Sequence, residues 1–449
     1  MKLHLKLSLV LSTLLMASCT SFTDSKQVDV KLHDPDLLWA DASHLALSST
    51  ADGKLFMGFS THWLDLNAEV LSYDPETESF DKPFGLGRVT GVKVGPGGEM
   101  SQGKIHTPFF ENDKVIYFGT AFGVAGYKWH RQRKAYAGGC FVAYDQKSGK
   151  AKVVGRAPKL EGILTLEPDF PRNCLYGISF PNGLLMRCDI GTGEVKILGQ
   201  VDDQYRKSKA MADSIDVTRC LVIHPESGVV YGSRKNGEIW HYDPAKGKIS
   251  ETGLNVKQGI VGQADDKALA SSHWRMALLS PGSDKIYATH QGTCSLFELD
   301  LKTKSITPLA RICSDADLNT MGNIRGSRLA FILADGKIHH LTHGPAVKVE
   351  GRKLNPNDQV YYVTYDLNSK KRIDHGPLMA PGDIRVCDSD TLAMLPDGRL
   401  FSLASIELID PARIEEMQSG DQGKRLFPKL GGRGVYFDMQ LVELPIVEK

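Results

Sequence analysis

Hydrophobic and polar positions alternate in short runs, and one arrangement of these runs recurs seven times along the chain. Each copy has a half-apolar run, a turn, and a second run that contains an aromatic or similar anchor residue. The turns contain Asp-Gly, Ser-Gly or Asn-Asp, residues that tolerate the positive φ of a tight hairpin. Each copy therefore predicts a β-hairpin. The anchors stand 52 to 62 residues apart, at Phe56, Tyr117, Tyr176, Tyr231, Tyr287, His339 and Phe401.

A second signature follows each of the first six anchors and predicts two more strands. It is an apolar run that ends in an Asp-initiated polar turn, as in HYDPAKGK, followed by a short run such as VKILG. Closing four-stranded units into a ring protects sheet edges that would otherwise be exposed. The sequence thus predicts an all-β fold, a seven-bladed β-propeller of four-stranded antiparallel blades over residues 35–449. A β-sandwich array or a β-helix, the alternatives, would need a different repeat length.

The first residues have the pattern of a bacterial export signal. Lys2 and Lys6 flank the start of an apolar run, and small residues precede Cys19. We expect residues 1–18 to be a signal peptide and residues 19–34 a linker. The run LMASC resembles a lipobox, which predicts lipidation of Cys19 and an outer-membrane lipoprotein; ordinary cleavage would instead leave a secreted or periplasmic protein. No later apolar run is long enough to span a bilayer, so membrane attachment would be through the lipid alone.

Composition and charge limit the kinds of partner that the protein is expected to bind. The formal net charge is +1 and the pI is about 7.6, so no global field favours nucleic acid or an anionic membrane. The chain has 44 glycines, but none forms a phosphate-cradling loop between a strand and a helix, and we expect no organic cofactor. We expect a monomer that holds any polyanion through a local patch.

The second repeat departs most from the pattern. The chain between Tyr117 and Tyr144 is 26 residues long, against 11 between Tyr176 and Cys188, so the loop between its second and third strands carries an insertion. Cations and aromatic rings alternate there, which suits a sulfated or carboxylated sugar chain; a solvated loop is the alternative. The candidate binding residues of the insertion are Trp129, His130, Arg131 and Arg133.

His106 begins the first strand of the same repeat, at the loop-facing end. An imidazole has a free pKa of about 6.5, which suits proton abstraction near neutral pH. A packed strand histidine is the alternative interpretation.

The cysteines predict a metal site rather than a disulfide framework. Seven cysteines stay after Cys19 is set aside, an odd number for an exported protein. Four residues fall at or near the first strands of repeats four to seven, where they could converge as a structural zinc site of three thiolates and one imidazole. These predicted ligands are Cys220, His273, Cys313 and Cys387, with His224, His290 and Cys294 as substitutes.

The chain resembles the seven-bladed propeller ulvan lyases of marine bacteria. The resemblance is carried by the blade count and, more sharply, by GKIHTPFFENDKVIYFGT, GYKWHRQRK and LYGISFPNGLLMRCDIGTGE. It implies a polysaccharide lyase that cleaves a sulfated, uronate-containing polymer by β-elimination, and a zinc bound by histidine and cysteines. Carried over by position, its catalytic residues are His106, His130, Tyr176 and Arg187, with Tyr231 as a further contact.

The elimination chemistry suits these residue types. A base removes the C5 proton of a uronate, an acid protonates the leaving oxygen, and a cation stabilises the charge that gathers on the carboxylate. However, Tyr176 occupies the repeated anchor position, so a structural role competes with catalysis. We also expect Arg187 to lie across from Tyr176, away from His106. A non-catalytic glycan- or protein-binding propeller and a lactonase-type hydrolase are the alternative functions.

Overall fold

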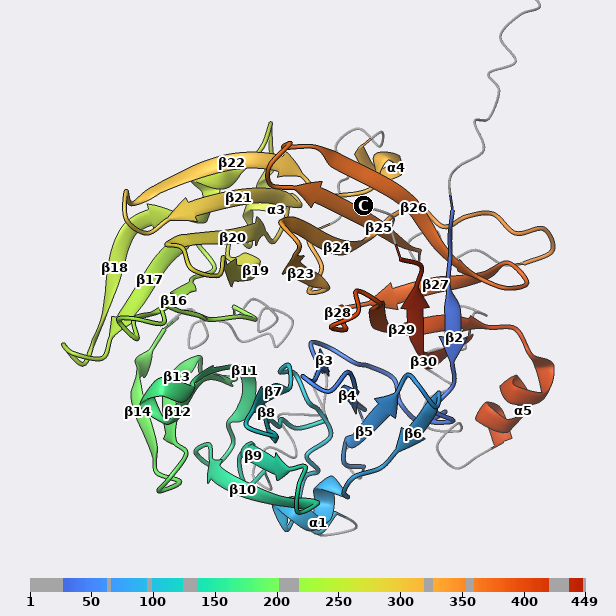
Figure 1. The fold of residues 1–449 in the computed structure, drawn as a ribbon, viewed down its shortest axis with the longest axis horizontal. Helices are drawn as coiled ribbons and strands as arrows, with labels where there is room; N and C mark the ends of the chain where they lie inside the picture. Colours follow the sequence, from blue (N-terminus) through green and yellow to red (C-terminus); the bar gives the residue numbers. More distant parts are fainter. Residues whose placement is uncertain are drawn as a thin grey trace, which may run out of the picture.

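The chain folds into an all-β propeller, in which antiparallel sheets stand around a common centre (Figure 1). The structure is a computed structural model. It describes residues 27–62, 66–94, 99–123, 136–201, 218–318, 326–352, 359–419 and 436–446.

Five sheets have four antiparallel strands each, and the sheets are named below by their strands. The first two consist of β3 (Leu47–Ser49), β4 (Leu55–Phe59), β5 (Glu69–Asp74) and β6 (Ser79–Asp81), and of β7 (Phe110–Asn112), β8 (Val115–Gly119), β9 (Cys140–Asp145) and β10 (Lys150–Arg156). The next consists of β11 (Gly162–Asp169), β12 (Cys174–Phe180), β13 (Leu184–Asp189) and β14 (Val195–Gln200). The last two are β15 (Val222–Ile223), β16 (Val230–Ser233), β17 (Glu238–Asp243) and β18 (Lys248–Asn255), and β19 (Trp274–Leu279), β20 (Lys285–His290), β21 (Ser295–Asp300) and β22 (Ser305–Arg311).

The other described strands form one ten-stranded sheet, with the order β2-β30-β29-β27-β26-β25-β24-β23, β1 beside β26 and β28 beside β29. The propeller of four-stranded antiparallel blades is therefore confirmed, but seven separate blades are not: one sheet stands where the sixth and seventh blades were predicted. Its strands are β1 (Val28–Asp29), β2 (Lys31–His33), β23 (Phe331–Ala334), β24 (Lys337–His343), β25 (Val360–Asp366), β26 (Arg372–Ala380), β27 (Ile384–Ser389), β28 (Ala393–Met394), β29 (Leu400–Leu408) and β30 (Tyr436–Leu444).

The first described strands correct the predicted linker over residues 19–34. β1 pairs with β26, and β2 pairs with β30 with Leu32 opposite Val442. The N-terminal strand thus completes a sheet with the C-terminal strand, which closes the ring. Sequence proximity could not reveal this pairing because its partner lies at the other end of the chain.

Short helices connect or flank the sheets. They are α1 (Leu86–Thr90), η2 (Phe170–Arg172), η5 (Val256–Gly259), α3 (Asp266–Leu269), α4 (Asp315–Leu318) and α5 (Pro411–Ser419). α5 lies at the outside of the ring (Figure 1). No described helix is both long enough and apolar enough to cross a bilayer.

The predicted Asp-initiated turns hold the third and fourth strands together. The Asp145, Asp300 and Asp366 carboxylates each accept hydrogen bonds from two backbone N–H groups of the turn that follows. Each aspartate thereby satisfies donors that the strands leave unpaired.

The core lies between neighbouring sheets. Trp240 is fully buried beside Tyr176 and Tyr242. A Cβ atom on Gly232 would lie 2.2 Å from the Cζ2 atom of Trp240. Glycine at position 232 thus gives the indole room to pack against the neighbouring strand.

Replacing Trp240 by alanine should therefore lower the free energy of unfolding by about 3–5 kcal/mol, because it leaves a large cavity in the core. Ile197→Ala is the matched control, since Ile197 is 55% exposed and its loss should change stability by no more than about 0.5 kcal/mol. Urea unfolding of the two variants measures the difference. Equal unfolding midpoints would contradict this account of the core.

Three buried histidines should make stability fall in acid. Burial lowers the pKa of His290, His339 and His340 to about 4, below the ordinary value of 6.5. Between pH 6.5 and 4 the unfolded chain binds more protons than the folded chain, so stability falls as the pH drops through this window, by about 1.4 kcal/mol per unit and group. Urea unfolding at a series of pH values measures this. His340→Asn should make the dependence shallower, and an unchanged slope would contradict it.

Candidate functional site

Charged side chains recur where the chain enters the innermost strands. These strands, among them β3, β7, β19, β23 and β28, surround the centre of the ring (Figure 1). Four residues lie three positions before the start of an inner strand: His44 before β3, Arg219 before β15, Arg328 before β23 and Asp390 before β28. His106 lies four positions before β7. Because these strands start at the same end of their sheets, their entry residues gather at one end of the axis. We define the axial cluster as His44, Lys104, His106, Arg219, Arg275, Arg328 and Asp390.

His106 is held between two other members of this cluster. Its ring stacks on that of His44, with the centroids 3.8 Å apart and the planes 27° from parallel. Arg219 Nη1 lies 3.3 Å from His106 Nδ1. His106 precedes sheet β7–β10 and Arg219 precedes sheet β15–β18, and sheet β11–β14 stands between them. The contact between the two side chains therefore passes the inner end of sheet β11–β14. Its span places His106 and Arg219 close to the axis.

The contact with Arg219 fixes the state of the His106 ring. A guanidinium can only donate a hydrogen bond, so Nδ1 accepts it and carries no proton. Burial, helped by the charges of Lys104 and Arg219, holds the pKa of His106 well below its usual value. His106 is therefore a neutral imidazole at neutral pH, with its free electron pair on Nδ1 directed at Arg219.

A third histidine, His62, positions the Lys104 ammonium near this pair. Lys104 Nζ lies 2.8 Å from His62 Nε2, and His62 Nδ1 lies 2.9 Å from Asp41 Oδ1. Because an ammonium only donates, His62 accepts from Lys104 through Nε2 and donates to Asp41 through Nδ1. This chain of contacts fixes Lys104, which lowers the pKa of both His44 and His106.

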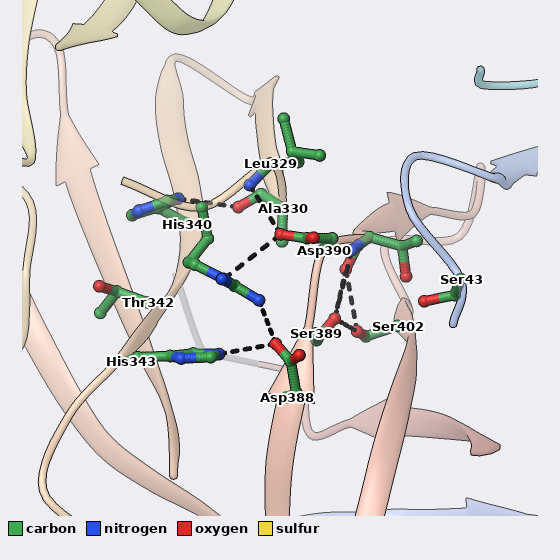
Figure 2. A network of polar contacts seen from close by, with 12 residues as sticks. Ser43, Leu329, Ala330, His340, Thr342, His343, Asp388, Ser389, Asp390 and Ser402 are labelled. Atoms are coloured by element: carbon green, nitrogen blue, oxygen red, sulfur yellow. Dashed lines mark hydrogen bonds and ion pairs between the residues drawn. The ribbon is translucent and has the colours of Figure 1, made fainter. Parts of the chain in front are cut away.

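Two further arginines face the same end of the axis. Arg328 forms ion pairs with Asp388 and, at 3.3 Å from Nε to Oδ1, with Asp390; His343 Nε2 lies 2.9 Å from Asp388 Oδ1 (Figure 2). Arg275 is only 7% exposed, and its Nε atom has no hydrogen-bond partner within the described part of the chain. Burial lowers the pKa of Arg275 to about 10, so it still carries its charge at neutral pH.

The cluster therefore has an excess of positive charge. Lys104 and the three arginines stand against the carboxylates of Asp388, Asp390 and, beside His62, Asp41, and the His44 and His106 rings are neutral. Buried cations in excess attract an anion that can enter, and guanidinium groups bind carboxylate or sulfate oxygens in pairs. This end of the axis can bind an anionic group next to a neutral imidazole base.

The structure places Tyr176 and Arg187 away from His106. Tyr176 is 1% exposed, packs beside Trp240 and Tyr242 in the core, and lies directly across from Arg187 in the strand pairing. The predicted opposition of these two residues is confirmed. Tyr176 also pairs with Glu167 near the end of β11, whereas His106 lies before the start of β7. The described part of the structure thus does not bring Tyr176 and Arg187 to His106, and His130 lies outside the described residues.

Few contacts define the positions of the other residues that were predicted to lie near the substrate. Tyr231 is half-buried in β16, its ring 6.1 Å from that of His241. Tyr136, at the end of the insertion, is buried, packs edge-on against Phe122 and donates a hydrogen bond to Gln102. The remaining predicted residues lie outside the described residues and are Cys19, Trp129, His130, Arg131 and Arg133.

The predicted zinc ligands are not assembled. Cys220 contacts the Arg275 carbonyl oxygen, and Cys387 contacts the Arg385 carbonyl oxygen. Cys313 lies near Cys294 rather than His273. The described ranges contain no group of three or more His, Cys, Asp or Glu side chains that could hold a metal ion, and the seven described cysteines are all free and buried. The zinc site therefore stays a prediction, and the proposed reaction uses no metal.

The sequence interpretation missed His44, Arg219 and Arg275. The signal that could have found them is their register, since each lies at or just before a predicted first strand, as His106 does. Single histidines and arginines carry no motif, and only their alignment across repeats shows that they share one end of the axis.

No protein-family model and no curated protein sequence matches this chain. Among solved structures, it is similar to a chain in the crystal structure of the mitotic checkpoint complex. The TM-score is 0.46 and the sequence identity 10%, over 85% of this chain and 88% of that one. A similarity this low says nothing about function, which has to be argued from the axial cluster.

Proposed function

We propose that the protein is a polysaccharide lyase that cleaves a sulfated, uronate-containing polymer by β-elimination. The observation that carries this proposal is the neutral His106 imidazole, whose Nδ1 atom faces the Arg219 guanidinium at 3.3 Å. β-Elimination from a uronate needs a base and a cation at adjacent atoms, because the C5 proton becomes acidic only when charge on the neighbouring carboxylate is stabilised.

In the proposed reaction, the substrate carboxylate takes over the hydrogen bond that Arg219 gives to His106. Nδ1 is then free to accept the C5 proton. The electron pair of the C5–H bond forms the C4–C5 double bond, the C4–O bond breaks, and the leaving oxygen takes a proton from a second group. Arg219, Arg275 and Lys104 stabilise the charge that develops on the carboxylate. Water is not consumed.

The finer features predicted from the sequence belong to the same proposal. We count the ten-stranded sheet as two blades, β23–β26 and β27–β30 with β2, which makes seven in all. His130, Trp129, Arg131 and Arg133 are proposed to bind the polymer. Export, with Cys19 as lipid anchor, would bring the enzyme to a polymer too large to enter a cell.

Incubation with ulvan and a panel of other uronate polymers tests the proposal. An unsaturated uronyl end absorbs ultraviolet light, so absorbance should rise with at least one sulfated uronate polymer. The panel should include a desulfated sample of the cleaved polymer, which isolates the contribution of sulfate. Binding without any rise in absorbance across the panel would favour the glycan-binding alternative.

A further inference from the structure

Three chain segments, 41–44, 60–62 and 103–106, are hydrogen-bonded to one another. A backbone bridge joins the first segment to the second. The Ser60 hydroxyl oxygen accepts a hydrogen bond of 3.1 Å from a backbone N–H of the third segment, and the Thr61 N–H donates one of 2.8 Å to a carbonyl oxygen of that segment. The three segments therefore form one unit, in which side chains of different segments keep fixed relative positions.

This unit carries two sets of side-chain contacts. His44 of the first segment stacks on His106 of the third, with the ring centroids 3.8 Å apart. Lys104 Nζ lies 2.8 Å from His62 Nε2, and His62 Nδ1 lies 2.9 Å from Asp41 Oδ1. Since Lys104 is two positions from His106 and Asp41 is three from His44, the same unit holds the ammonium and the proposed base.

The tautomer of His62 depends on Asp41. An ammonium only donates, so His62 Nε2 accepts from Lys104 and the ring proton lies on Nδ1, where it is donated to Asp41 Oδ1. The His62 backbone N–H also points at this carboxylate, 3.1 Å from Oδ1 and 3.3 Å from Oδ2. With the proton on Nε2 instead, two donors would face each other and the contact with Lys104 would be lost.

We propose that Asp41 is a positioning residue, which holds the Lys104 ammonium in place for the reaction by fixing the tautomer of His62. Its role in turnover rests on the proposed lyase function, whereas its control of the His62 tautomer does not. The side chains of His62 and Asp41 are 28% and 13% exposed, so neither belongs to the apolar core that holds the sheets together. Substitutions of either residue should therefore fold.

Two substitutions of Asp41 separate the hydrogen bond from the rest of the side chain. Asp41→Ala removes both acceptor oxygens, so the ring proton should move to Nε2 and Lys104 should lose its partner. Asp41→Asn keeps one oxygen. The His62 backbone N–H selects this oxygen for the Oδ1 position, because an amide nitrogen there would face a second donor. The asparagine variant should therefore keep the wild-type tautomer.

Nitrogen NMR of the imidazole ring measures the tautomer without any assay of activity. In the full-length protein with isotope-labelled histidine, the signals of His62 are assigned by their loss in His62→Gln. The proton should lie on Nδ1 in the wild type and in Asp41→Asn, and on Nε2 in Asp41→Ala. Asp284→Ala is the matched control, because Asp284 Oδ1 lies 2.9 Å from His224 Nε2, outside the axial cluster. A proton on Nε2 in the wild type, or an unchanged tautomer in Asp41→Ala, would overturn the proposal.

Turnover provides the second measurement. In Asp41→Ala kcat should fall by roughly 10- to 100-fold, the scale on which the loss of a partner that orients a functional histidine acts. kcat/KM should fall with it, because the ammonium acts on charge that develops in the transition state. Asp41→Asn should recover most of this loss, and Asp284→Ala should match the wild type.

A second pair of variants keeps the proposal testable if Asp41→Ala does not fold. His62→Leu offers Lys104 no acceptor and should show the same loss of kcat, whereas His62→Gln has an amide oxygen and should recover part of it. Equal kcat in Asp41→Ala and Asp284→Ala would overturn the role in turnover. Absence of turnover in the wild type would refute the lyase function and leave the tautomer result standing.

Discussion

Replacing His106 by alanine should reduce kcat/KM on a cleavable uronate polymer by roughly 10²- to 10⁴-fold, the contribution of a positioned general base. The imidazole is the group that accepts the C5 proton in the proposed reaction, and alanine removes it together with its contact to Arg219. The ring is 8% exposed and stacks on His44, so its loss should cost some stability without unfolding the sheets. Initial rates of ultraviolet absorbance measure the effect.

His241→Ala is the matched control for this variant. His241 lies in β17, a third strand, half-buried beside Tyr231 and outside the axial cluster. Its loss should leave turnover within about twofold of the wild type, in line with the small effect expected of a residue outside the site. Turnover by His106→Ala at the rate of His241→Ala would remove His106 from the mechanism.

Replacing Arg219 by alanine should lower kcat by roughly 10²- to 10³-fold, as the loss of one donor to a developing oxyanion does. Arg219→Lys should recover part of this loss, since it restores the charge without the two-pronged geometry of a guanidinium. The pH profile provides a second measurement: without the Arg219 charge the pKa of His106 should rise, and the acid limb should move to higher pH.

Arg234→Ala is the control for the loss of an arginine. Arg234 pairs with Glu238 and Glu251 at the edge of sheet β15–β18 and belongs to no part of the axial cluster. We expect its kcat to be unchanged. Equal losses in Arg219→Ala and Arg234→Ala would mean that general electrostatics, rather than the position of Arg219, explains the effect.

The periodic part of the sequence predicted the architecture because each repeat contains its own evidence. A hairpin and an Asp-initiated turn are local features, and the strands after Tyr117, Tyr176 and Tyr231 lie where the repeats indicated. Closure through β2 was not predictable, because its partner β30 is remote in sequence and neither strand alone differs from a linker or an outer strand.

The candidate site also has residues that local sequence features reveal and residues that only remote contacts reveal. His106 was identified because it departs from the apolar pattern around it, although it lies four positions before β7 rather than at the start of the first strand, as predicted. Arg219 was overlooked because its importance comes from a contact across the inner end of a neighbouring sheet, which no spacing along the chain reveals. Tyr176 shows the converse difficulty, since an aromatic residue at a repeated anchor position fits a core role, and the structure places it in the core.

The zinc site stays a prediction, because the described contacts do not join its four residues. Cys220, His273, Cys313 and Cys387 share a region of successive repeats, but their side chains have different neighbours. Residues that directly precede the first strands of different repeats come together, as His44, Arg219 and Asp390 do. This does not hold for Cys387, which lies within β27, or for Cys313, which follows β22.

The central claim is that the axial cluster performs β-elimination, and analysis of the products in water labelled with heavy oxygen tests it most directly. Elimination breaks the C4–O bond without adding water, so the new ends should be unsaturated and carry no label. Mass spectrometry of oligosaccharides released from a sulfated uronate polymer should therefore show products one water lighter than hydrolysis fragments. Saturated products that contain one labelled oxygen would contradict the account and identify a hydrolase.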